Sequence, residues 1–360
     1  MLMNSPKIVI VDDSMLVRNI LSDVLEKKEG FQIIATGKTG VDCVELAEKL
    51  RPDFIILDIE MPIMDGLSAL AEIKKKRLPT AVIMLSVLTQ HGADATFRAL
   101  ELGAIDFVPK PSSGNQFSPE EIAEVLAGKI KGYLDSKLSL PLAKPSEKIA
   151  RPSSPTPINK SFQKPVSVQA IGIGTSTGGP KALQALFSAI PADFSKPILV
   201  VQHMPPGFTK AFAERLNSLS KISVKEAENG DVVEPGKAYI APGDYQMKVV
   251  SKNGSKVIEL EQTTTVNGHR PSIEVLFNSM SEVYGGNHLL SVIMTGMGRD
   301  GSQSITNIHN QGGVTLAQDE ASSVVYGMNR VAVELGGIDL VLPLDDIVPK
   351  MIEILKTRGN

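Results

Sequence analysis

Two kinds of hydrophobic pattern alternate along the first part of the chain. Apolar, β-branched runs predict strands at 7–11, 31–35, 54–57, 81–85 and 105–108. Between these runs, apolar positions recur with the 3.6-residue period of a helix at 15–27, 41–50, 66–76 and 93–102. Strands that alternate with helices of this length form a parallel sheet with helices on both faces. The pattern therefore predicts a doubly wound (βα)5 domain over residues 5–138.

The same alternation returns in the second part of the chain. It predicts strands at 168–173, 197–201, 288–294, 313–316 and 339–342, and helices at 180–186, 208–219, 271–284, 301–310 and 324–335. Three further runs, at 237–241, 246–251 and 256–261, predict a β-rich insertion with a turn at Asn253-Gly254. We expect a second doubly wound α/β domain, mostly parallel, over residues 167–358.

The stretch between the two domains, residues 139–166, has almost no apolar periodicity. It is rich in proline, serine and lysine, a composition that cannot bury enough surface to fold and is typical of a linker.

Composition limits the class of protein further. Hydrophobic residues make up 42% of the chain and charged residues 21%, as in soluble globular proteins. The net charge of -3 implies no bulk attraction to nucleic acid or to an anionic membrane. No apolar run reaches the roughly 18–20 residues of a membrane span, and the first residues lack the features of a secretory signal. With a single cysteine, Cys43, the chain forms no internal disulfide, so we expect a cytoplasmic protein without membrane insertion.

Polar residues follow four of the predicted strands in the N-terminal domain. Asp12 and Asp13 follow the first strand, and Asp58 ends the third. In a doubly wound sheet these positions converge on one crevice, where three carboxylates repel one another unless a hard cation such as Mg²⁺ is present. Ser86 and Lys110 follow the next two strands and supply the hydroxyl and the cation that hold a phosphoryl oxygen. Asp12 and Asp13 alone would be solvated loop residues, but the positions together favour a functional site.

These residues stand in three segments that resemble the two-component response-regulator receiver domain: Val11-Asp12-Asp13-Ser14, Leu57-Asp58-Ile59-Glu60-Met61-Pro62-Ile63-Met64-Asp65-Gly66 and Pro109-Lys110-Pro111. The resemblance implies that Asp58 accepts a phosphoryl group from a histidine kinase. It also implies that Mg²⁺ is held by Asp12, Asp13 and Asp58, together with the backbone carbonyl of Glu60. Ser86 and Lys110 would sense the phosphoryl group, and Phe107 occupies the position of a switching aromatic residue.

The most informative segment of the C-terminal domain is Gly174-Thr175-Ser176-Thr177-Gly178, on a turn between a strand and a helix. A serine on such a turn exposes its hydroxyl beside unpaired backbone N–H groups, which suits either a nucleophile or a phosphate site. A dinucleotide site would place a third glycine at Thr177 and an acid after the next strand. That strand ends instead in Gln202-His203, so the nucleophile is favoured.

A nucleophilic serine needs a base and an acid that orients the base. His203 follows the strand expected beside that of Ser176, while His269 lies in a polar loop and stays a second candidate. Asp300, in the glycine-rich turn Thr295-Gly296-Met297-Gly298-Arg299-Asp300-Gly301, is the preferred acid, and Asp319 competes with it. The order Ser, His, Asp and the early position of the serine exclude an α/β-hydrolase fold and retain only its chemistry.

The C-terminal domain resembles the chemotaxis protein-glutamate methylesterase family, CheB. The segments that carry the resemblance are those around Ser176 and Asp300, Gln202-His203-Met204-Pro205-Pro206-Gly207-Phe208, His269-Arg270-Pro271-Ser272 and Gln318-Asp319-Glu320. The resemblance implies a catalytic triad of Ser176, His203 and Asp300. Backbone N–H groups near Thr177 or Met297 are candidates for holding the oxyanion.

The family implies a phosphorylation-activated hydrolase that removes methyl esters from glutamates of chemoreceptors and deamidates their glutamines, in sensory adaptation. The unphosphorylated receiver would cover the catalytic cleft. A chemotaxis histidine kinase would be the phosphodonor and methyl-accepting chemoreceptors the substrate. Mg²⁺ would serve phosphorylation, and ester hydrolysis would need no cofactor.

Two other classes of protein remain to be weighed against this interpretation. A phospho-switched binding module with an inactive hydrolase domain is disfavoured because Ser176, His203 and Asp300 are all present. A receiver linked to a DNA-binding domain would need a basic recognition helix, which the C-terminal sequence lacks. We therefore expect no nucleic-acid partner.

Overall fold

The computed structural model describes residues 5–27, 29–87, 89–110, 118–138 and 167–358. The chain divides into two compact units between Lys131 and Gly132, within helix α5 (Pro119–Leu138). The linker predicted at 139–166 lies outside the described residues, and the domain boundaries at 138 and 167 stay predictions.

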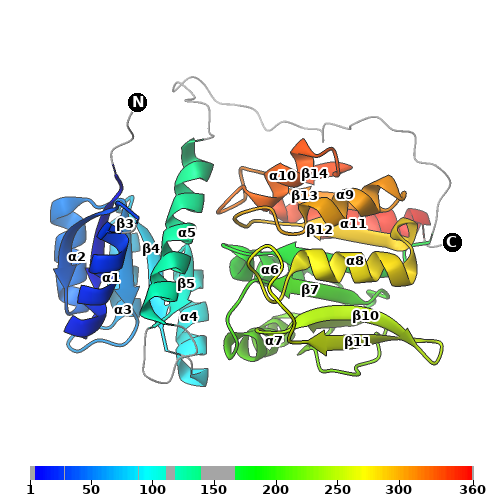
Figure 1. The fold of residues 1–360 in the computed structure, drawn as a ribbon, viewed down its shortest axis with the longest axis horizontal. Coiled ribbons are helices and arrows are strands. Elements are labelled where there is room, and N and C mark those ends of the chain that lie inside the picture. The colour runs from blue at the N-terminus through cyan, green and yellow to red at the C-terminus, as the bar shows by residue number, and fades with distance from the viewer. Residues whose placement is uncertain (1–4, 28, 88, 111–117, 139–166, 359–360) are drawn as a thin grey trace. The chain divides into compact units, whose positions relative to one another are not determined.

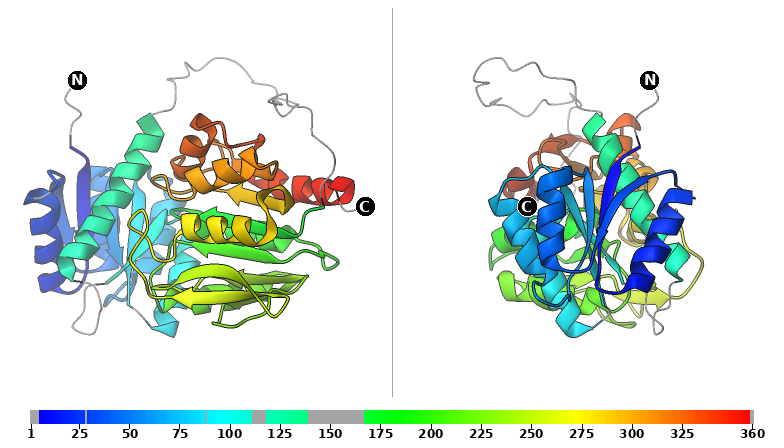
Figure 2. Two further views of the ribbon diagram at one scale, coloured as in Figure 1. Left: turned by 45° about the vertical axis from the view of Figure 1, so that its right-hand side comes forward. Right: turned by 90° about the vertical axis from the view of Figure 1, so that its left-hand side faces the viewer.

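The N-terminal unit is a five-stranded parallel sheet in the order β2-β1-β3-β4-β5. Its strands are β1 (Lys7–Val11), β2 (Gln32–Gly37), β3 (Phe54–Asp58), β4 (Ala81–Ser86) and β5 (Asp106–Pro109). Helices α2 (Gly40–Leu50), α3 (Gly66–Lys75) and α4 (Gln90–Leu102) pack on one face, and α1 (Met15–Lys27) and α5 cover the other (Figure 2). Every residue of β3 and β4 is buried, as expected for a parallel sheet covered on both sides. The doubly wound (βα)5 prediction is confirmed.

The C-terminal unit is built on a seven-stranded parallel sheet in the order β14-β13-β12-β6-β7-β9-β8. Its strands are β6 (Ala170–Thr175), β7 (Ile198–Gln202), β8 (Ser223–Glu226), β9 (Lys237–Ile240), β12 (Leu289–Ile293), β13 (Val314–Gln318) and β14 (Leu340–Leu342). A separate antiparallel hairpin, β10 (Gln246–Lys252) and β11 (Ser255–Glu261), packs on helix α8 (Ile273–Tyr284).

Helices cover both faces of this second sheet (Figure 1). On one face α6 (Gly179–Ala189), α7 (Phe208–Leu219) and α11 (Leu344–Arg358) pack together. On the other, α8 packs against α9 (Ser302–Asn310), which packs against α10 (Met328–Glu334). The mostly parallel α/β fold expected from the sequence is confirmed.

The structure refines the predicted insertion. The run 237–241 is β9, which pairs with β7 in the main sheet, so only β10 and β11 stand outside it. Edge strand β8 completes the sheet beyond β9, and the hydrophobic pattern did not reveal it because only one of its four residues is buried.

Two glycines of β6 bring helix α8 close to the sheet. A Cβ at Gly172 would lie 2.7 Å from the Phe277 ring, and one at Gly174 would lie 2.5 Å from Ile273. The Gly-x-Gly spacing in this strand is therefore explained by helix packing rather than by a dinucleotide. It draws the N-terminus of α8 toward the end of β6, where the candidate site lies.

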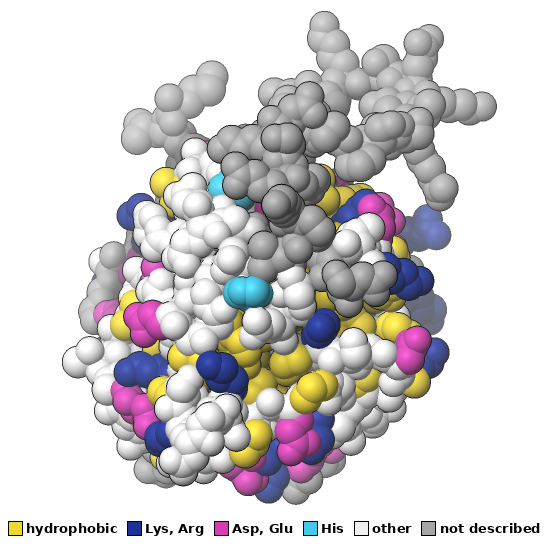
Figure 3. All heavy atoms as spheres, turned by 90° about the vertical axis from the view of Figure 1, so that its right-hand side faces the viewer, with side chains coloured by type: hydrophobic (Ala, Val, Ile, Leu, Met, Phe, Trp, Pro, Cys, Tyr) yellow, Lys and Arg dark blue, Asp and Glu magenta, His cyan; other side chains and the backbone are white. Residues whose placement is uncertain are grey.

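Charged side chains of both signs are interspersed on the face of the molecule in Figure 3, in keeping with the small net charge. Within the described ranges, no helix is long and apolar enough to cross a membrane.

Candidate functional site

Ser176 lies immediately after the last residue of β6 on a tightly held turn. Its N–H donates to the Thr295 carbonyl at 3.0 Å, and its own carbonyl accepts from the Gly179 N–H at 2.8 Å. Gly178 has a φ of +80°, and a Cβ at Gly179 would lie 2.0 Å from the Gln202 Oε1 atom. Both positions therefore require glycine, and the turn holds the Ser176 side chain 6% exposed at the carboxyl end of the sheet.

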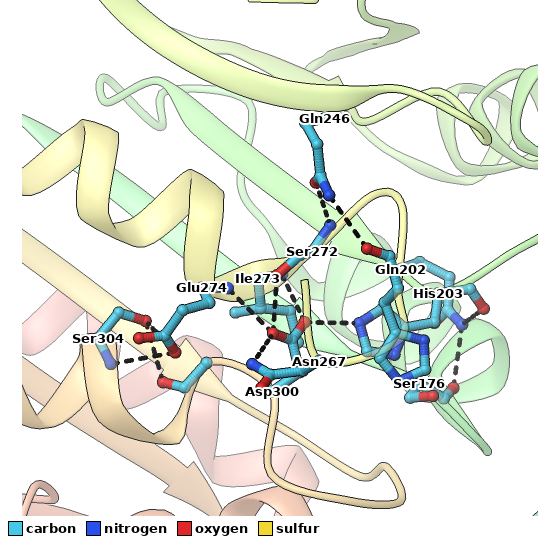
Figure 4. Close-up of polar contacts among 12 residues, drawn as sticks. Ser176, Gln202, His203, Gln246, Asn267, Ser272, Ile273, Glu274, Asp300 and Ser304 are labelled. Atoms are coloured by element: carbon cyan, nitrogen blue, oxygen red, sulfur yellow. Dashed lines mark hydrogen bonds and ion pairs between the residues drawn. The ribbon is translucent and has the colours of Figure 1, made fainter. Parts of the chain in front are cut away.

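His203 lies beside this turn because of the strand register. Thr175 of β6 pairs with Gln202 of β7, and the His203 N–H donates to the Thr175 carbonyl at 3.1 Å. In Figure 4 the His203 ring lies between Ser176 and Asp300. Its Nε2 is 2.8 Å from the Asp300 Oδ2, while its Nδ1 is buried and has no hydrogen-bond partner among the described residues.

The Asp300 carboxylate is only 1% exposed and is surrounded by donors. Besides His203 it accepts from the Asn267 side chain at 2.9 Å, the Ser272 hydroxyl at 2.7 Å and the Ile273 backbone N–H at 2.7 Å. The last of these is the first N–H of α8, whose positive end favours a negative charge. Figure 4 shows these donors converging on the two carboxylate oxygens.

The donors determine the charge of Asp300. Burial by itself would raise its pKa, but the hydrogen bond and charge of His203, with the hydrogen bonds from Asn267 and Ser272, outweigh burial and hold the pKa at about 2. An ionised carboxylate only accepts hydrogen bonds, so the proton of a neutral His203 lies on Nε2. The lone pair is then on Nδ1, the buried nitrogen without a partner among the described residues, which is available to accept a proton.

The structure separates the candidates that the sequence left open. The His269 ring stacks face to face on His203, with the centroids 3.7 Å apart and the planes 13° from parallel. Asp319 accepts from the Ser322 backbone and hydroxyl at 2.9 and 2.6 Å, in its own loop. His203 and Asp300 thus form the hydrogen-bonded pair beside Ser176.

Thr177 and Met297 are the two positions suggested for the oxyanion, and Thr177 and the residue before Met297 both adjoin the serine. Thr177 follows Ser176 in the turn, is 1% exposed, and accepts through its carbonyl from the Thr295 hydroxyl at 2.8 Å. Met297 follows Gly296, whose backbone passes so near the serine that a Cβ there would lie 2.8 Å from the Ser176 Cβ.

A second cluster occupies the carboxyl edge of the N-terminal sheet. The side chains of Asp12, Asp13 and Asp58 offer oxygens that all lie within 4.8 Å of one another. The Lys110 Nζ is 2.6 Å from Asp58, 3.2 Å from Asp12 and 3.4 Å from Asp13. Three negative groups therefore face one positive group.

This excess of negative charge contributes to a raised pKa of Asp58. Burial, followed by the charge of Asp12, raises the pKa of Asp58 to about 7 even though Lys110 acts in the opposite direction. Burial also raises the pKa of Asp12, and its Oδ2 is buried without a hydrogen-bond partner in the described part of the chain. Clustered carboxylate oxygens with spare acceptor capacity fit Mg²⁺, which prefers such ligands.

The two residues expected to respond to a phosphoryl group lie at neighbouring strand ends. Ser86 ends β4 and is 1% exposed; its hydroxyl donates to the Gly92 carbonyl at 3.1 Å and accepts from Thr96 at 2.7 Å. The structure thus turns Ser86 toward α4, whereas it brings Lys110 directly to the carboxylates. Phe107, at the position of the switching aromatic, is 4% exposed.

Sequence reasoning missed Asn267 and Ser272, which hold Asp300, and Thr96, which binds Ser86. Asn267-Gly268 is a dipeptide typical of a tight turn, and this signal could have located the turn but not what its side chains contact. Ser272 was noted only as part of a longer segment. Their roles depend on contacts to residues distant in the sequence.

One chain thus carries a receiver-type acidic crevice and an α/β unit with a serine, a histidine and an ionised carboxylate side by side. The fold and the two sites define the class as a response regulator with a hydrolase-type output domain. The family model for the response regulator receiver domain matches residues 8–120, and that for CheB methylesterase matches residues 171–351. The chain belongs to the CheB methylesterase family.

Full-length relatives agree with this assignment. The protein-glutamate methylesterase/protein-glutamine glutaminase of Pyrococcus horikoshii is 44% identical, over 98% of this chain and 95% of the relative. A second protein of that name, from Pseudomonas aeruginosa, is 40% identical over 98% of each chain. The crystal structure of the Thermotoga maritima CheB methylesterase catalytic domain matches 52% of this chain and 100% of its own, with a TM-score of 0.51 and 42% identity.

Proposed function

We propose that this protein is a phosphorylation-activated hydrolase that removes methyl esters from glutamate side chains and deamidates glutamine side chains. The observation that carries the proposal is the hydrogen bond from His203 to an ionised Asp300, which leaves a lone pair on the other ring nitrogen of a residue whose backbone adjoins the Ser176 turn. The names of relatives that match nearly the whole chain support the substrate class.

In the first half of the reaction, Ser176 is the nucleophile. Its hydroxyl passes its proton to the His203 Nδ1 as the oxygen attacks the ester carbonyl, and Asp300 stabilises the imidazolium through Nε2. Backbone N–H groups near Thr177 or Met297 hold the oxyanion, an interaction that is commonly worth about 10²–10³ in rate. The imidazolium then gives its proton to the departing oxygen, so methanol leaves and a Ser176 acyl ester remains.

In the second half, water attacks the acyl ester. His203 takes a proton from this water and returns one to the Ser176 oxygen, which releases a glutamate carboxylate and restores the enzyme. A glutamine side chain reacts in the same way, with ammonia as the leaving group. Neither half of the reaction requires a cofactor.

The N-terminal unit supplies the regulation in this proposal. Asp58 accepts the phosphoryl group, and Ser86 and Lys110 respond to it. Asp12, Asp13 and Asp58 would hold Mg²⁺, which supplies neutralisation of negative charge when a phosphoryl group approaches the carboxylates. Phosphorylation relieves inhibition of the catalytic unit, since a charge change at such a site biases a two-state arrangement.

The partners follow from this pair of domains. A chemotaxis histidine kinase donates the phosphoryl group, and methyl-accepting chemoreceptors provide the substrate in the cytoplasm. The domains of the proposal are a receiver over residues 5–138, a linker over 139–166 and a catalytic domain over 167–358.

The test is methanol release from methylated chemoreceptor membranes by the purified full chain, with and without a small-molecule phosphodonor. We expect release that rises with the phosphodonor, and almost none from Ser176→Ala. Ser188→Ala, an exposed serine on α6, is the matched control and keeps wild-type release. Undiminished release from Ser176→Ala would exclude the proposed nucleophile, and none from the wild type would favour a binding module with an inactive hydrolase domain.

A further inference from the structure

The loop that joins β11 to α8 touches both members of the hydrogen-bonded pair. Its Asn267 side chain donates to the Asp300 Oδ1 at 2.9 Å. Its His269 ring lies flat on the His203 ring, 3.7 Å away. One short segment therefore contacts the acid at its oxygen and the base at its face, and none of the chemical steps above uses either contact.

The tip of the loop is a rigid two-residue turn. Val266 and His269 exchange two backbone hydrogen bonds, at 3.0 and 2.9 Å. Between them Asn267 and Gly268 both have positive φ values, +53° and +80°. Asn-Gly is the preferred dipeptide for a turn of this kind, so local sequence fixes the spacing of the Asn267 and His269 side chains.

The base of the loop is tied down from both ends by Asp244. This carboxylate forms an ion pair with Arg270 and accepts from the Gln262 side chain at 3.0 Å. Asp244 also donates its N–H to the Arg270 carbonyl at 3.1 Å. Hydrogen bonds and an ion pair thus hold the loop at its base as well as at its tip.

A glutamine adds a further anchor directly beneath the turn. Gln246 donates to the His269 carbonyl at 3.1 Å and accepts from the Ser272 N–H at 2.8 Å. Gln246 is fully buried, so these bonds exchange little with water. The anchored backbone of His269 therefore holds its ring in a fixed place.

We propose that His269 and Asn267 are positioning residues of the Ser176 site: His269 braces the face of the His203 ring, and Asn267 fixes the Asp300 carboxylate that binds its edge. A hydrogen bond at one ring nitrogen leaves the ring free to tilt, whereas a parallel aromatic contact restricts that tilt. The stacked ring also faces the positive charge that His203 carries after it takes the serine proton. The inference rests on the proposed function and deepens it.

The first test compares two replacements of His269. His269→Ala removes the aromatic face and should lower kcat for methanol release about tenfold, with KM changed by less than about twofold. His269→Phe keeps an aromatic face that carries no proton, and should restore kcat to within about threefold of the wild type. Thr265→Ala, an exposed residue of the same loop, is the matched control and keeps wild-type kcat.

The second test replaces Asn267 by glycine, which tolerates the positive φ and removes only the side-chain donor. Asn267→Gly should lower kcat about tenfold, because a hydrogen bond to a buried carboxylate is lost. A thermal midpoint near that of the wild type, measured for each variant, shows that the effect comes from the site rather than from unfolding.

A fluorophosphonate probe separates this inference from the substrate assignment. The Ser176 oxygen attacks the phosphorus, fluoride leaves, and the serine proton passes to His203, so the labelling rate reports the serine–histidine pair without any receptor. We expect the same order of labelling rates: wild type and His269→Phe fast, His269→Ala and Asn267→Gly slow. A wild type that is labelled but releases no methanol would overturn the proposed function alone. The inference would be overturned if the wild type and His269→Ala were labelled at equal rates, or if His269→Phe lost as much labelling rate as His269→Ala. It would also be overturned if the wild type were not labelled at all.

Discussion

Two buried aspartates, one in each unit, have opposite electrostatic surroundings. Asp58 is 2% exposed and has a pKa raised to about 7, whereas Asp300 is 1% exposed and has a pKa lowered to about 2. Burial disfavours the charge of both carboxylates. The difference lies in what surrounds them: two other carboxylates and Lys110 around Asp58, and a histidine with several neutral donors around Asp300.

In the proposed function, this contrast distinguishes a group that reacts, Asp58, from a group that orients, Asp300. The acceptor positions of Asp300 are filled by hydrogen bonds from the protein, so its charge is fixed and it holds His203 in one tautomer. Asp58 shares one lysine with Asp12 and Asp13, so its site gains from a bound cation. Four predictions test this contrast.

The largest effect is expected from Asp300→Asn. An amide presents one oxygen and one NH2 group to donors that all require acceptors, so the His203 tautomer is no longer fixed and the base beside Ser176 is lost. We expect kcat for methanol release to fall by about 10³–10⁴. Phosphorylation of Asp58 in the same variant should proceed at the wild-type rate, and a rate of methanol release near that of the wild type would refute an orienting role for Asp300.

The second effect is loss of regulation in Asp58→Asn. Only a carboxylate oxygen can form the acyl phosphate, so the ratio of methanol release with and without phosphodonor should fall to about one. Asp23→Asn, an exposed aspartate of the same unit, is the control and should keep the wild-type ratio. A phosphodonor response that persists in Asp58→Asn would place the phosphoryl group elsewhere.

The two sites differ in how far the sequence predicts them. Asp12 follows and Asp58 ends a buried strand of a regular parallel sheet, so the strand pattern alone brings them together. Ser176 and His203 meet for the same reason, because β6 and β7 are neighbours in register. The donors around Asp300 come instead from a loop and a helix start that are 26 to 33 residues away, and no periodicity predicts which of their side chains face inward.

The same reasoning explains why the sequence does not predict β8 and β9 as strands of the main sheet. β9 carries an apolar run, but the sequence does not show that it joins the main sheet, since helix α7 and strand β8 separate it from its partner β7 along the chain. β8 has a single buried residue, so its pairing with β9 leaves little trace in the hydrophobic pattern. Edge strands of this kind are defined by tertiary contacts.

Removal of divalent cations tests the Asp58 side of the comparison between Asp58 and Asp300. With a chelator present, Lys110 is the one cation within the described ranges that is paired with Asp12, Asp13 and Asp58, and formation of the Asp58 acyl phosphate should fall to background. Added Mg²⁺ should restore it. The measurement is radiolabel transfer from a phosphodonor, and labelling that is unchanged by the chelator would contradict a magnesium-dependent site.

The smallest effect concerns stability, and its sign follows from the lowered pKa of Asp300. A carboxyl group whose folded pKa lies below its unfolded value stabilises the fold above the unfolded pKa, and this contribution is lost as the pH falls through the folded pKa. For a shift from 3.8 to about 2, the contribution is about 2 kcal/mol, present near neutral pH and lost between about pH 4 and about pH 2. The measurement is urea unfolding of the full chain, monitored by hydrogen exchange in β6 and β12. The difference in free energy of unfolding between the wild type and Asp300→Asn should shrink by this amount as the pH is lowered. A stability gap that stays constant over this range would mean that Asp300 is not held as an anion by its neighbours, and the contrast with Asp58 would fail.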